Sequence, residues 1–382
     1  MRSKDDRIIN ITEDVKWIGI LDFDITTFDI VMTTEFGTTY NSYFINGEKK
    51  ALVEVAKEKF SDVYFEKLNS VTDPACISYI ILDHTEPDHS GSLKLLLEAA
   101  PEATVVGSGN AIKYLEEMLN VPFRSMVVKD GDTLDLGNKT LHFISAPNLH
   151  WPDSIYTWLE EDGILFTCDS FGAHYCTREM TDELTDNYLK AFRYYFDVIL
   201  KPYSRFLIKA IEKIKPLDIR YICPGHGPVL DKNRAKIVKL TEKYANEYIA
   251  KNAGVTGKNI LVAYVSAYGF TGIAAEAIAK GIRETGDFSV KVVDIEHIDL
   301  NELDGLITES SALLIGSPTI NQNTLLPVYK MFAVINPIRD KGKMAGAFGS
   351  YGWSGEAAGI ILETLKTLKL KIFEETAAFR FR

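Results

Sequence analysis

The sequence has few cysteines, no long apolar run and a deficit of positive charge. Its four cysteines are scattered and form no CxxC pair, which argues against a disulfide framework, an iron–sulfur module or a zinc ribbon. No apolar stretch reaches the roughly 20 residues of a membrane helix, and residues 1–15 lack the apolar centre of a signal peptide. A formal net charge of −11 disfavours nucleic acid and anionic membranes as partners. A protein of the reducing cytoplasm is expected.

The chain is too long for one hydrophobic core of average size. With 382 residues it is expected to form two domains. Glycine and small polar residues at 252–257 follow a predicted long helix, roughly 232–251, and precede an apolar run at 259–265. We therefore predict domains 1–253 and 254–382.

The first domain has the pattern of short strands with helices between and after them. Hairpins are predicted around Asn46-Gly47, Gly137-Asn138 and Asp162-Gly163, because such pairs favour tight turns. Buried strands are expected at 76–82, 103–107 and 219–223, a helix at 92–100, and a largely helical segment at 177–215. This α/β pattern predicts a sandwich of two sheets flanked by helices.

Potential metal ligands gather at the ends of predicted strands. Four of the seven histidines follow an apolar strand, and one aspartate has a similar place; these residues are His84, His89, His150, His226 and Asp169. Loops at strand ends are where rigid scaffolds present reactive groups. Carboxylates that converge with these imidazoles repel one another and need a compensating cation.

The segment from His84 to His89 is the densest part of this set. It holds four potential ligands within six residues, namely His84, Glu86, Asp88 and His89. Pro87 disfavours helix at Glu86, so an irregular loop is expected. In an extended stretch, alternation would put His84, Glu86 and Asp88 on one side. One metal cannot readily use all of these and the distant ligands as well, so we predict two metals bridged by Asp169.

The other three histidines are expected to be structural. His142 fits the alternation of a strand, and His174 and His297 have no partner signal in the sequence. His174 lies near Asp169 in the chain, which leaves open a role beside the ligands.

Taken together, these residues resemble the metallo-β-lactamase superfamily, in its flavodiiron branch. The resemblance rests on the HxExDH segment from His84 to His89, on His150, on Asp169 and on the Gly225-His226-Gly227 turn. The resemblance implies an αββα sandwich that holds two irons. It assigns His84, Glu86 and His150 to one iron, Asp88, His89 and His226 to the other, and Asp169 to both. In some family members the equivalent of His89 is not a ligand. The zinc hydrolases of the superfamily carry histidine where this chain has Glu86, and a carboxylate-rich set suits iron.

Two further positions follow from the same resemblance. The family usually has histidine where this chain has Asp29, which predicts a difference in proton supply or substrate preference. A tyrosine of segment 193–196 is expected to approach the metals, and we choose Tyr195.

The segment from Ile260 to Gly281, at the start of the second domain, has the pattern of a strand, a turn and a helix. The turn, from Ser266 to Thr271, consists largely of small and hydroxyl residues. Such a turn at a helix N-terminus makes a phosphate site, because backbone N–H groups and the helix dipole favour an anion. Two more apolar strands, at 312–315 and 346–348, end in loops of the same kind that begin at Gly316 and Gly349, as a doubly wound sheet presents them to a ligand. Tyr351 and Trp353 offer flat faces for stacking.

All three loops resemble flavodoxin, which implies a doubly wound parallel sheet that binds FMN. The expected FMN contacts are Ser266, Tyr268, Gly269, Phe270, Thr271, Ser317, Pro318, Thr319, Asn321, Ser350, Tyr351, Gly352, Trp353 and Gly355.

The combined resemblance implies a flavodiiron oxidoreductase that passes electrons through FMN to two irons and reduces dioxygen to water, nitric oxide to nitrous oxide, or both. It also implies an external electron donor such as rubredoxin, and a head-to-tail homodimer or a dimer of dimers. Two alternatives stay open. One is a zinc-dependent hydrolase with a flavodoxin-like appendage, and the other is a flavin-binding electron carrier with a vestigial metal site.

Overall fold

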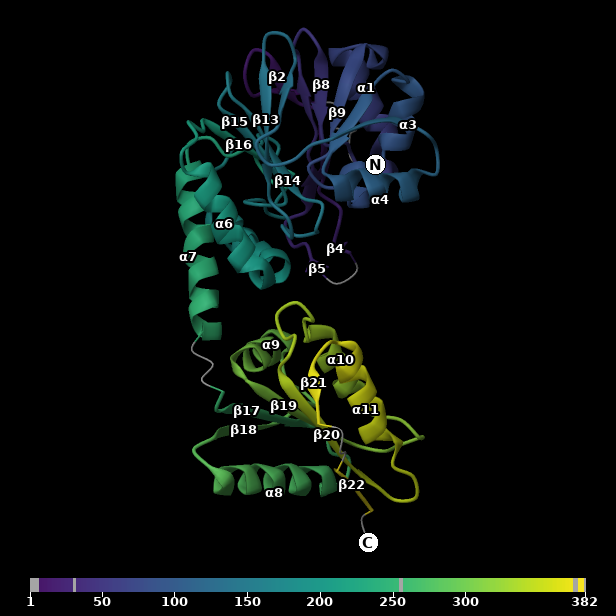
Figure 1. Ribbon diagram of the computed structural model, residues 1–382, viewed down its shortest axis with the longest axis vertical. Coiled ribbons are helices and arrows are strands. Elements are labelled where there is room, and N and C mark those ends of the chain that lie inside the picture. Colours follow the sequence, from purple (N-terminus) through teal and green to yellow (C-terminus); the bar gives the residue numbers. More distant parts are fainter. Residues whose placement is uncertain (1–6, 30–31, 254–256, 374–376, 381–382) are drawn as a thin grey trace. The chain divides into compact units, whose positions relative to one another are not determined.

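The computed structural model describes residues 7–29, 32–253, 257–373 and 377–380 (Figure 1). The chain forms two compact units, residues 1–246 and 247–382. The division falls inside helix α7 (Arg234–Ala253), and the boundary expected after residue 253 stays a prediction. No helix among the described residues is long and apolar enough to cross a membrane.

The first unit is built on two β-sheets. The larger has seven strands in the order β1-β2-β7-β8-β9-β10-β11, and the smaller has five in the order β12-β13-β14-β15-β16. The strands of the larger sheet are β1 (Ile9–Asn10), β2 (Val15–Trp17), β7 (Tyr43–Ile45), β8 (Lys50–Val53), β9 (Ile77–Ile81), β10 (Thr104–Gly107) and β11 (Arg124–Val127). Those of the smaller are β12 (Thr133–Asp135), β13 (Thr140–Ser145), β14 (Ile155–Leu159), β15 (Ile164–Cys168) and β16 (Tyr221–Pro224). Two short pairs, β3 (Ile20–Asp22) with β6 (Thr38–Tyr40) and β4 (Thr27–Phe28) with β5 (Met32–Thr33), complete the unit.

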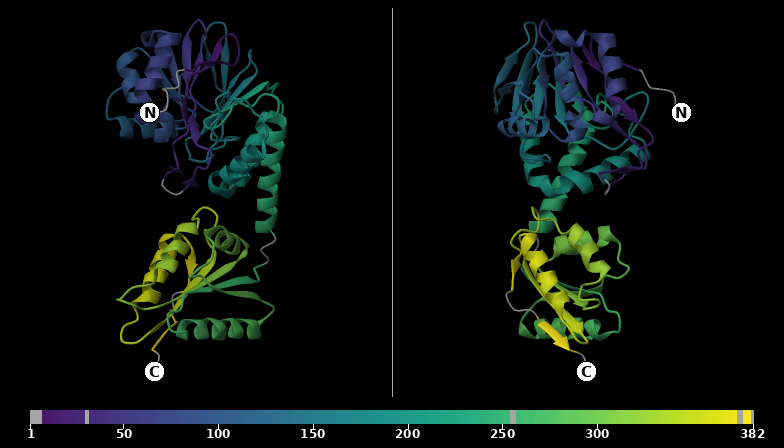
Figure 2. Two further views of the ribbon diagram at one scale, coloured as in Figure 1. Left: turned by 180° about the vertical axis from the view of Figure 1, so that it is seen from behind. Right: turned by 90° about the vertical axis from the view of Figure 1, so that its right-hand side faces the viewer.

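Three apolar layers hold this unit together. Side chains from both sheets, such as Trp17, Val53 and Phe166, pack between the sheets. Helices α1 (Ser61–Val71), α3 (Leu93–Ala99) and α4 (Gly109–Leu119) cover the outer face of the larger sheet. Helices α5 (Asp186–Tyr195), α6 (Ser204–Ile214) and α7 cover that of the smaller sheet (Figure 2). The predicted αββα sandwich is confirmed, and so are the three hairpins, which are β7–β8, β12–β13 and β14–β15.

The predicted helical segment 177–215 is wrong in its first part. Residues 177–185 are not helical, and α5 begins only after Thr185, whose hydroxyl accepts a hydrogen bond from the backbone N–H of Tyr188. The carboxylate of Asp182 instead accepts hydrogen bonds from the backbone N–H groups of Asp231 and Asn233, which holds this stretch as a loop. Pro202 lies in a 3-10 turn (Lys201–Tyr203) between α5 and α6, because proline cannot continue the hydrogen bonding of a helix interior.

The second unit is a parallel sheet with helices on both faces. Its strands follow the order β18-β17-β19-β20-β21, with β22 also pairing to β20. They are β17 (Asn259–Tyr264), β18 (Ser289–Asp294), β19 (Ala312–Pro318), β20 (Met344–Tyr351), β21 (Lys371–Ile372) and β22 (Ala377–Arg380). Helix α8 (Phe270–Thr285) packs on one face, and α9 (Leu300–Glu309), α10 (Leu326–Val334) and α11 (Glu356–Thr367) pack on the other. The predicted doubly wound sheet is confirmed, and its strand order reverses between β17 and β19.

Two strands of this sheet are longer than the sequence indicates. β19 extends to Pro318 and β20 to Tyr351, with Pro318 in register with Ser350. Ser317 and Ser350 therefore lie on strands and not in the loops that follow.

Candidate metal centre and flavin site

The dense segment after β9 contains a helical turn. Pro87–Ser90 forms the short helix α2, with Pro87 at its first position, where the missing N–H costs no hydrogen bond. The expected irregular loop is confirmed for residues 84–86 but is wrong from Pro87 onward, and the grouping of Asp88 with His84 and Glu86 is wrong. The helical turn directs Asp88 and His89 toward His226, away from the group that contains His84.

The first group of potential ligands combines three segments of the chain. The Oε2 atom of Glu86 lies 3.2 Å from His84 Nε2 and 3.0 Å from His150 Nε2. His150 follows β13, and with Asp169 these residues bring one ligand atom each within 4.8 Å of one another.

The second group is more deeply buried than the first. Asp88 Oδ2 lies 3.0 Å from His226 Nε2 and 3.4 Å from His89 Nε2, and all three side chains are buried. His226 follows β16, in the Gly225-His226-Gly227 turn. A Cβ atom at Gly225 would lie 2.5 Å from His89 Cε1, so only glycine leaves room for that ring.

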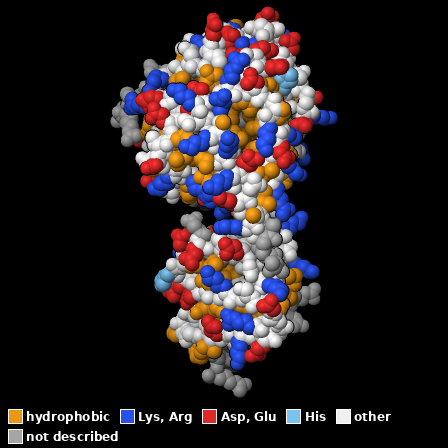
Figure 3. Space-filling model, turned by 90° about the vertical axis from the view of Figure 1, so that its left-hand side faces the viewer, with side chains coloured by type: hydrophobic (Ala, Val, Ile, Leu, Met, Phe, Trp, Pro, Cys, Tyr) orange, Lys and Arg blue, Asp and Glu red, His pale blue; other side chains and the backbone are white. Residues whose placement is uncertain are grey.

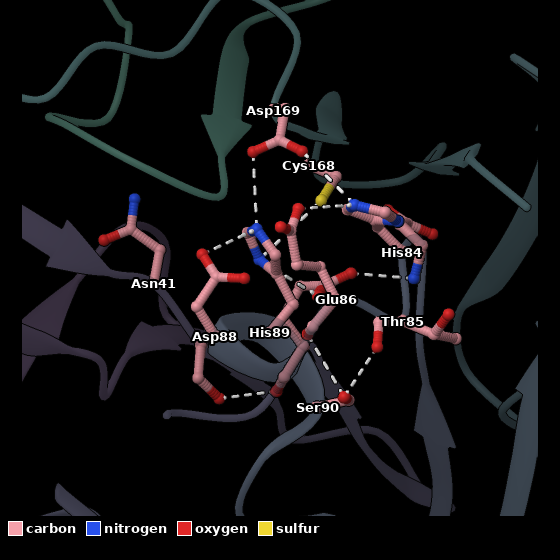
Figure 4. Close-up of polar contacts among 12 residues, drawn as sticks. Asn41, His84, Thr85, Glu86, Asp88, His89, Ser90, Cys168 and Asp169 are labelled. Atoms are coloured by element: carbon pink, nitrogen blue, oxygen red, sulfur yellow. Dashed lines mark hydrogen bonds and ion pairs between the residues drawn. The ribbon is translucent and has the colours of Figure 1, made fainter. Parts of the chain in front are cut away.

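Asp169 lies between the two groups, and Figure 4 shows its carboxylate pointing into them. Oδ2 lies 3.5 Å from His150 Nε2 and 3.7 Å from His84 Nε2, whereas Oδ1 lies 3.3 Å from His89 Nε2 and 3.6 Å from His226 Nε2. Each carboxylate oxygen thus faces one group, as the bridging role implied by the sequence requires.

The imidazoles are held from behind by oxygen atoms. Nδ1 of His84 lies 3.2 Å from both oxygens of Asp153, and Nδ1 of His226 lies 2.5 Å from the Thr39 carbonyl. Asp153 also accepts hydrogen bonds from the backbone N–H and the hydroxyl of Thr85. An acceptor at Nδ1 places the proton there and leaves the Nε2 lone pair for a metal.

Opposite charges in the site perturb its pKa values strongly. Burial raises the pKa of Glu86, but hydrogen bonds with His150 and His84 outweigh burial and lower it to about 2. Burial lowers the pKa of His84, but hydrogen bonds with Asp153 and Glu86 outweigh burial and raise it to about 10. The carboxylates therefore favour positive charge at the centre of the site.

The donor atoms fit a pair of metal cations. Among the described residues, Asp88 Oδ1, His89 Nε2 and Asp169 Oδ2 are buried without a hydrogen-bond partner, which is costly unless something else binds them. Ligands at about 2.1 Å from one metal stand roughly 3.0–3.4 Å apart in octahedral or tetrahedral geometry. Most of the nitrogen–oxygen distances within each group fall in or close to that range.

Tyr195 and His174 lie beside this centre. The Tyr195 hydroxyl donates a hydrogen bond of 2.9 Å to Asp169 Oδ1. The buried His174 ring packs on the rings of Tyr195 and His226, with centroids 4.9 and 5.1 Å away, and its Nδ1 lies 2.9 Å from the Thr38 hydroxyl. His142 is half-buried and pairs with Glu160, and His297 is exposed.

Asp29 is an exposed residue close to Glu86 and Asp88. Its pKa is raised by burial and by the negative charges of Glu86 and Asp88. The structure thus places Asp29 beside the ligands, as the comparison of the 28–29 segment with the family predicts.

Sequence reasoning missed the residues behind the ligands. Asp153 carried a signal, because it follows His150 closely in a turn. Glu54 carried one as well, since it is the single charged residue in the apolar run Ala51–Ala56. Neither can be matched to its histidine partner without the fold.

The loops of the second unit meet at the carboxyl end of the sheet, on both sides of its switch point. Helix α8 begins after Gly269, whose φ of 84° suits glycine. The Ser266 hydroxyl accepts a hydrogen bond from the Gly272 N–H, and the Thr271 and Ser350 hydroxyls lie 2.8 Å apart. Thr319 accepts from the Ala357 N–H and so joins the second loop to the start of α11, which follows Gly355. Asn321 has a φ of 53° in the same loop.

Two aromatic side chains of these loops are strongly exposed. Tyr268 is 78% exposed and Trp353 is 74% exposed. Large apolar side chains exposed near a phosphate-type turn fit a flat ligand such as a flavin. Phe270 is the first residue of α8, Tyr351 is the last residue of β20, and Gly352 follows Tyr351 in the third loop.

The surface shows no extended basic stripe on the face drawn in Figure 3, where basic and acidic side chains are interspersed. The sequence has 53 acidic and 42 basic residues, so the basic side chains are outnumbered by acidic ones.

Comparisons with known proteins cover both units. A family model described as ODP family beta lactamase matches residues 38–227, and the flavodoxin family model matches residues 262–381. The "Flavo-diiron protein FprA2" of Clostridium acetobutylicum is 40% identical over 373 residues, which cover 96% of this chain and 92% of the relative.

Solved structures agree over nearly the whole chain. The rubredoxin oxygen:oxidoreductase of Desulfovibrio gigas has a TM-score of 0.72 at 28% identity, covering 98% of this chain and 93% of its own. The flavodiiron protein of Giardia intestinalis has a TM-score of 0.69 at 28% identity, covering 98% of this chain and 92% of its own.

Proposed function

Since this chain belongs to the flavodiiron proteins, we propose that it is an oxidoreductase that reduces dioxygen to water, nitric oxide to nitrous oxide, or both, with FMN and two irons as cofactors. The observation that carries the proposal is the position of Asp169, whose two oxygens face two separate groups of three ligands. A carboxylate in that position would supply negative charge to two adjacent cations.

Each iron has a defined set of protein ligands in this proposal. The first iron would be held by His84, Glu86 and His150 and the second by Asp88, His89 and His226, with Asp169 facing both groups. When bound, FMN supplies one- and two-electron redox chemistry, and the two irons supply reducing equivalents at a centre where a small diatomic substrate can bind.

The surrounding residues hold protons and shape the site. Burial, together with the charge of Asp169, keeps the pKa of Tyr195 well above its usual range, so the phenol stays protonated and donates to Asp169. Asp29 is exposed beside Glu86 and Asp88, where its carboxyl group would be able to exchange protons with an incoming substrate. The buried rings of His174 and Phe28, with centroids 4.4 Å apart, pack against the His226 ring and make that side of the site apolar.

The proposed flavin site uses the three loops of the second unit. The backbone at the start of α8, with Ser266 and Thr271, would bind the FMN phosphate. Trp353 and Tyr268 would flank the isoalloxazine ring, and the 317–321 segment would line the site beside them.

The zinc-hydrolase alternative is less well supported. Glu86 contacts two histidines at the position where imidazole is usual in those hydrolases, and a hydrolase has no use for three flavin-type loops. The alternative of an electron carrier with a vestigial metal site leaves the buried, partnerless ligand atoms without a role.

We further propose that a small redox protein such as rubredoxin donates the electrons. The proposal is supported by the name of the Desulfovibrio gigas relative, which is a rubredoxin oxygen:oxidoreductase. A head-to-tail homodimer, alone or paired into a tetramer, would bring the FMN loops of one subunit to the metal site of its partner, and two-fold symmetry would create two such contacts. None of the four cysteines forms a disulfide in the structure, which suits a reducing compartment such as the cytoplasm.

One experiment separates the candidate functions. The purified full chain is analysed for metals and flavin, and its rates with dioxygen and with nitric oxide are measured anaerobically with reduced rubredoxin. About two irons and one FMN per chain, with turnover of either gas, are expected. Zinc with hydrolytic activity would favour the hydrolase, and flavin without metal would favour the electron carrier.

A further inference from the structure

The buried carboxylate of Glu54 lies behind His89, on the side of the ring opposite to the metal ligands. Glu54 Oε2 is 3.4 Å from His89 Nδ1, whereas His89 Nε2 faces Asp88 Oδ2 at 3.4 Å and Asp169 Oδ1 at 3.3 Å. The ring therefore has one nitrogen toward the proposed second iron and the other toward Glu54.

The backbone holds Glu54 firmly in this position. Its Oε1 atom accepts a hydrogen bond from the Asp83 N–H at 2.7 Å, and its carbonyl accepts one from the Ser42 hydroxyl at 2.7 Å. The N–H of Val55, the next residue, donates to the His89 carbonyl at 2.9 Å. Among the described residues, Oε2 has no hydrogen-bond partner, so the His89 N–H is the donor within its reach.

The Cys168 thiol competes for the same ring nitrogen. Its Sγ lies 3.7 Å from His89 Nδ1. A thiol that donates to Nδ1 would leave the proton on Nε2 and block metal binding there. An acceptor oxygen of Glu54 at Nδ1 favours the opposite tautomer, with the proton on Nδ1 and the lone pair on Nε2.

We infer that Glu54 is a positioning residue that makes His89 a ligand of the second iron, by accepting the Nδ1 proton of its ring. The inference rests on the proposed two-metal site and adds to it. It completes a pattern, because His84 and His226 also have an oxygen at Nδ1, from Asp153 and from the Thr39 carbonyl. Removing such a partner typically weakens metal binding 10–100-fold.

The test uses Glu54→Gln in the full-length protein. The Asp83 N–H and the His89 ring N–H each need an acceptor oxygen on the side chain of residue 54. Glutamine has only one such oxygen, so one of the two donors loses its acceptor. We expect the variant to keep the first iron and to bind the second roughly 10–100-fold more weakly in a chelator competition. Mössbauer spectra of the 57Fe-loaded protein should show one iron signal unchanged and the other altered or lost.

Three further variants separate positioning from general damage. Tyr64→Phe removes a hydroxyl that lies 3.0 Å from Ser42 Oγ, so it disturbs the same buried region without touching the ring, and should keep both irons. In a His89→Ala background, Glu54→Gln should cause no further loss of iron. If Glu54→Gln does not fold, Glu54→Asp keeps the carboxyl group but withdraws it from the ring, and should also weaken the binding of the second iron.

The outcomes are distinct. A wild-type protein that binds fewer than two irons counts against the proposed function itself. A wild-type protein with two irons, together with a folded Glu54→Gln variant of unchanged iron affinity and spectrum, overturns only the inference. It is also overturned if Glu54→Gln weakens iron binding equally in the His89→Ala background.

Discussion

The hydroxyl of Tyr195 donates a hydrogen bond of 2.9 Å to Oδ1 of Asp169, the oxygen that faces His89 and His226. The other oxygen of Asp169 has no hydrogen-bond partner among the described residues. The tyrosine thus acts on one half of the proposed bridge.

Tyr195→Phe should leave the iron content at two and lower turnover about tenfold, the equivalent of one hydrogen bond of about 1.4 kcal/mol to a charged group. Steady-state rates with dioxygen and nitric oxide measure the change. The matched control is Tyr194→Phe, because the Tyr194 hydroxyl accepts a hydrogen bond from the Thr33 N–H and does not contact Asp169. Equal rates in the two variants would remove Tyr195 from the reaction.

Asp169→Asn should sharply reduce bound iron and abolish turnover while FMN stays bound. Asparagine keeps the shape of the side chain but loses the charge that two adjacent cations share. Metal analysis and flavin absorbance of one preparation provide both measurements. Full iron occupancy with normal turnover would disprove the bridging assignment.

Trp353→Ala should weaken FMN binding by roughly 1–3 kcal/mol, because an exposed indole that covers a flavin face buries a large apolar area. Fluorescence titration of the FMN-free protein measures the affinity, and the iron content should not change. Ile338→Ala is the control, since Ile338 is also exposed on the second unit but lies outside the three loops. An FMN affinity equal to that of the control would move the flavin away from Trp353.

Two inactive variants should complement each other if electrons pass between subunits. Asp169→Asn lacks the metal site, and Thr271→Ala with Trp353→Ala lacks the flavin. Mixed under conditions that allow subunit exchange, they should regain part of the wild-type activity, because a head-to-tail dimer then contains one working pair of sites. No recovery despite demonstrated exchange would argue for transfer within one chain.

A buried ion pair in the first unit predicts a pH-dependent stability. Lys139 is 7% exposed and pairs with Asp162 at 2.6 Å and with Asp14 at 3.0 Å. Burial lowers its pKa, but the bonds to Asp162 and Asp14 outweigh burial and raise it. Because the folded-state pKa is the higher one, the stabilisation is complete below the unfolded pKa of about 10.4 and is lost as pH rises through the folded value.

Lys139→Met should therefore lower the free energy of unfolding by about 1.5–3 kcal/mol near pH 7, and the difference from wild type should shrink above roughly pH 10.5. Urea denaturation across pH measures it. Lys213→Met, which breaks a largely exposed pair with Asp130, should cost less than about 1 kcal/mol at every pH. A constant Lys139→Met deficit up to pH 12 would contradict the raised pKa.

The strand-end ligands could be predicted from the sequence because each follows an apolar run that can only be a buried strand. The pairing of ligands could not be predicted from local alternation, because Pro87 begins a helical turn and directs Asp88 and His89 away from His84. Glu54 and Asp153 escaped prediction for another reason. Their roles depend on contacts between distant segments, as in the pair Glu54–His89, and no local pattern encodes such contacts.

The close approach of Gly225 to the His89 ring also constrains how this sequence can evolve. Any other residue at 225 would place its Cβ against the imidazole, so neither position can change alone without displacing the other. Among distant descendants of this chain, a side chain at 225 should therefore appear together with the loss of the histidine at 89, and such lineages would carry a second metal position with one protein ligand fewer.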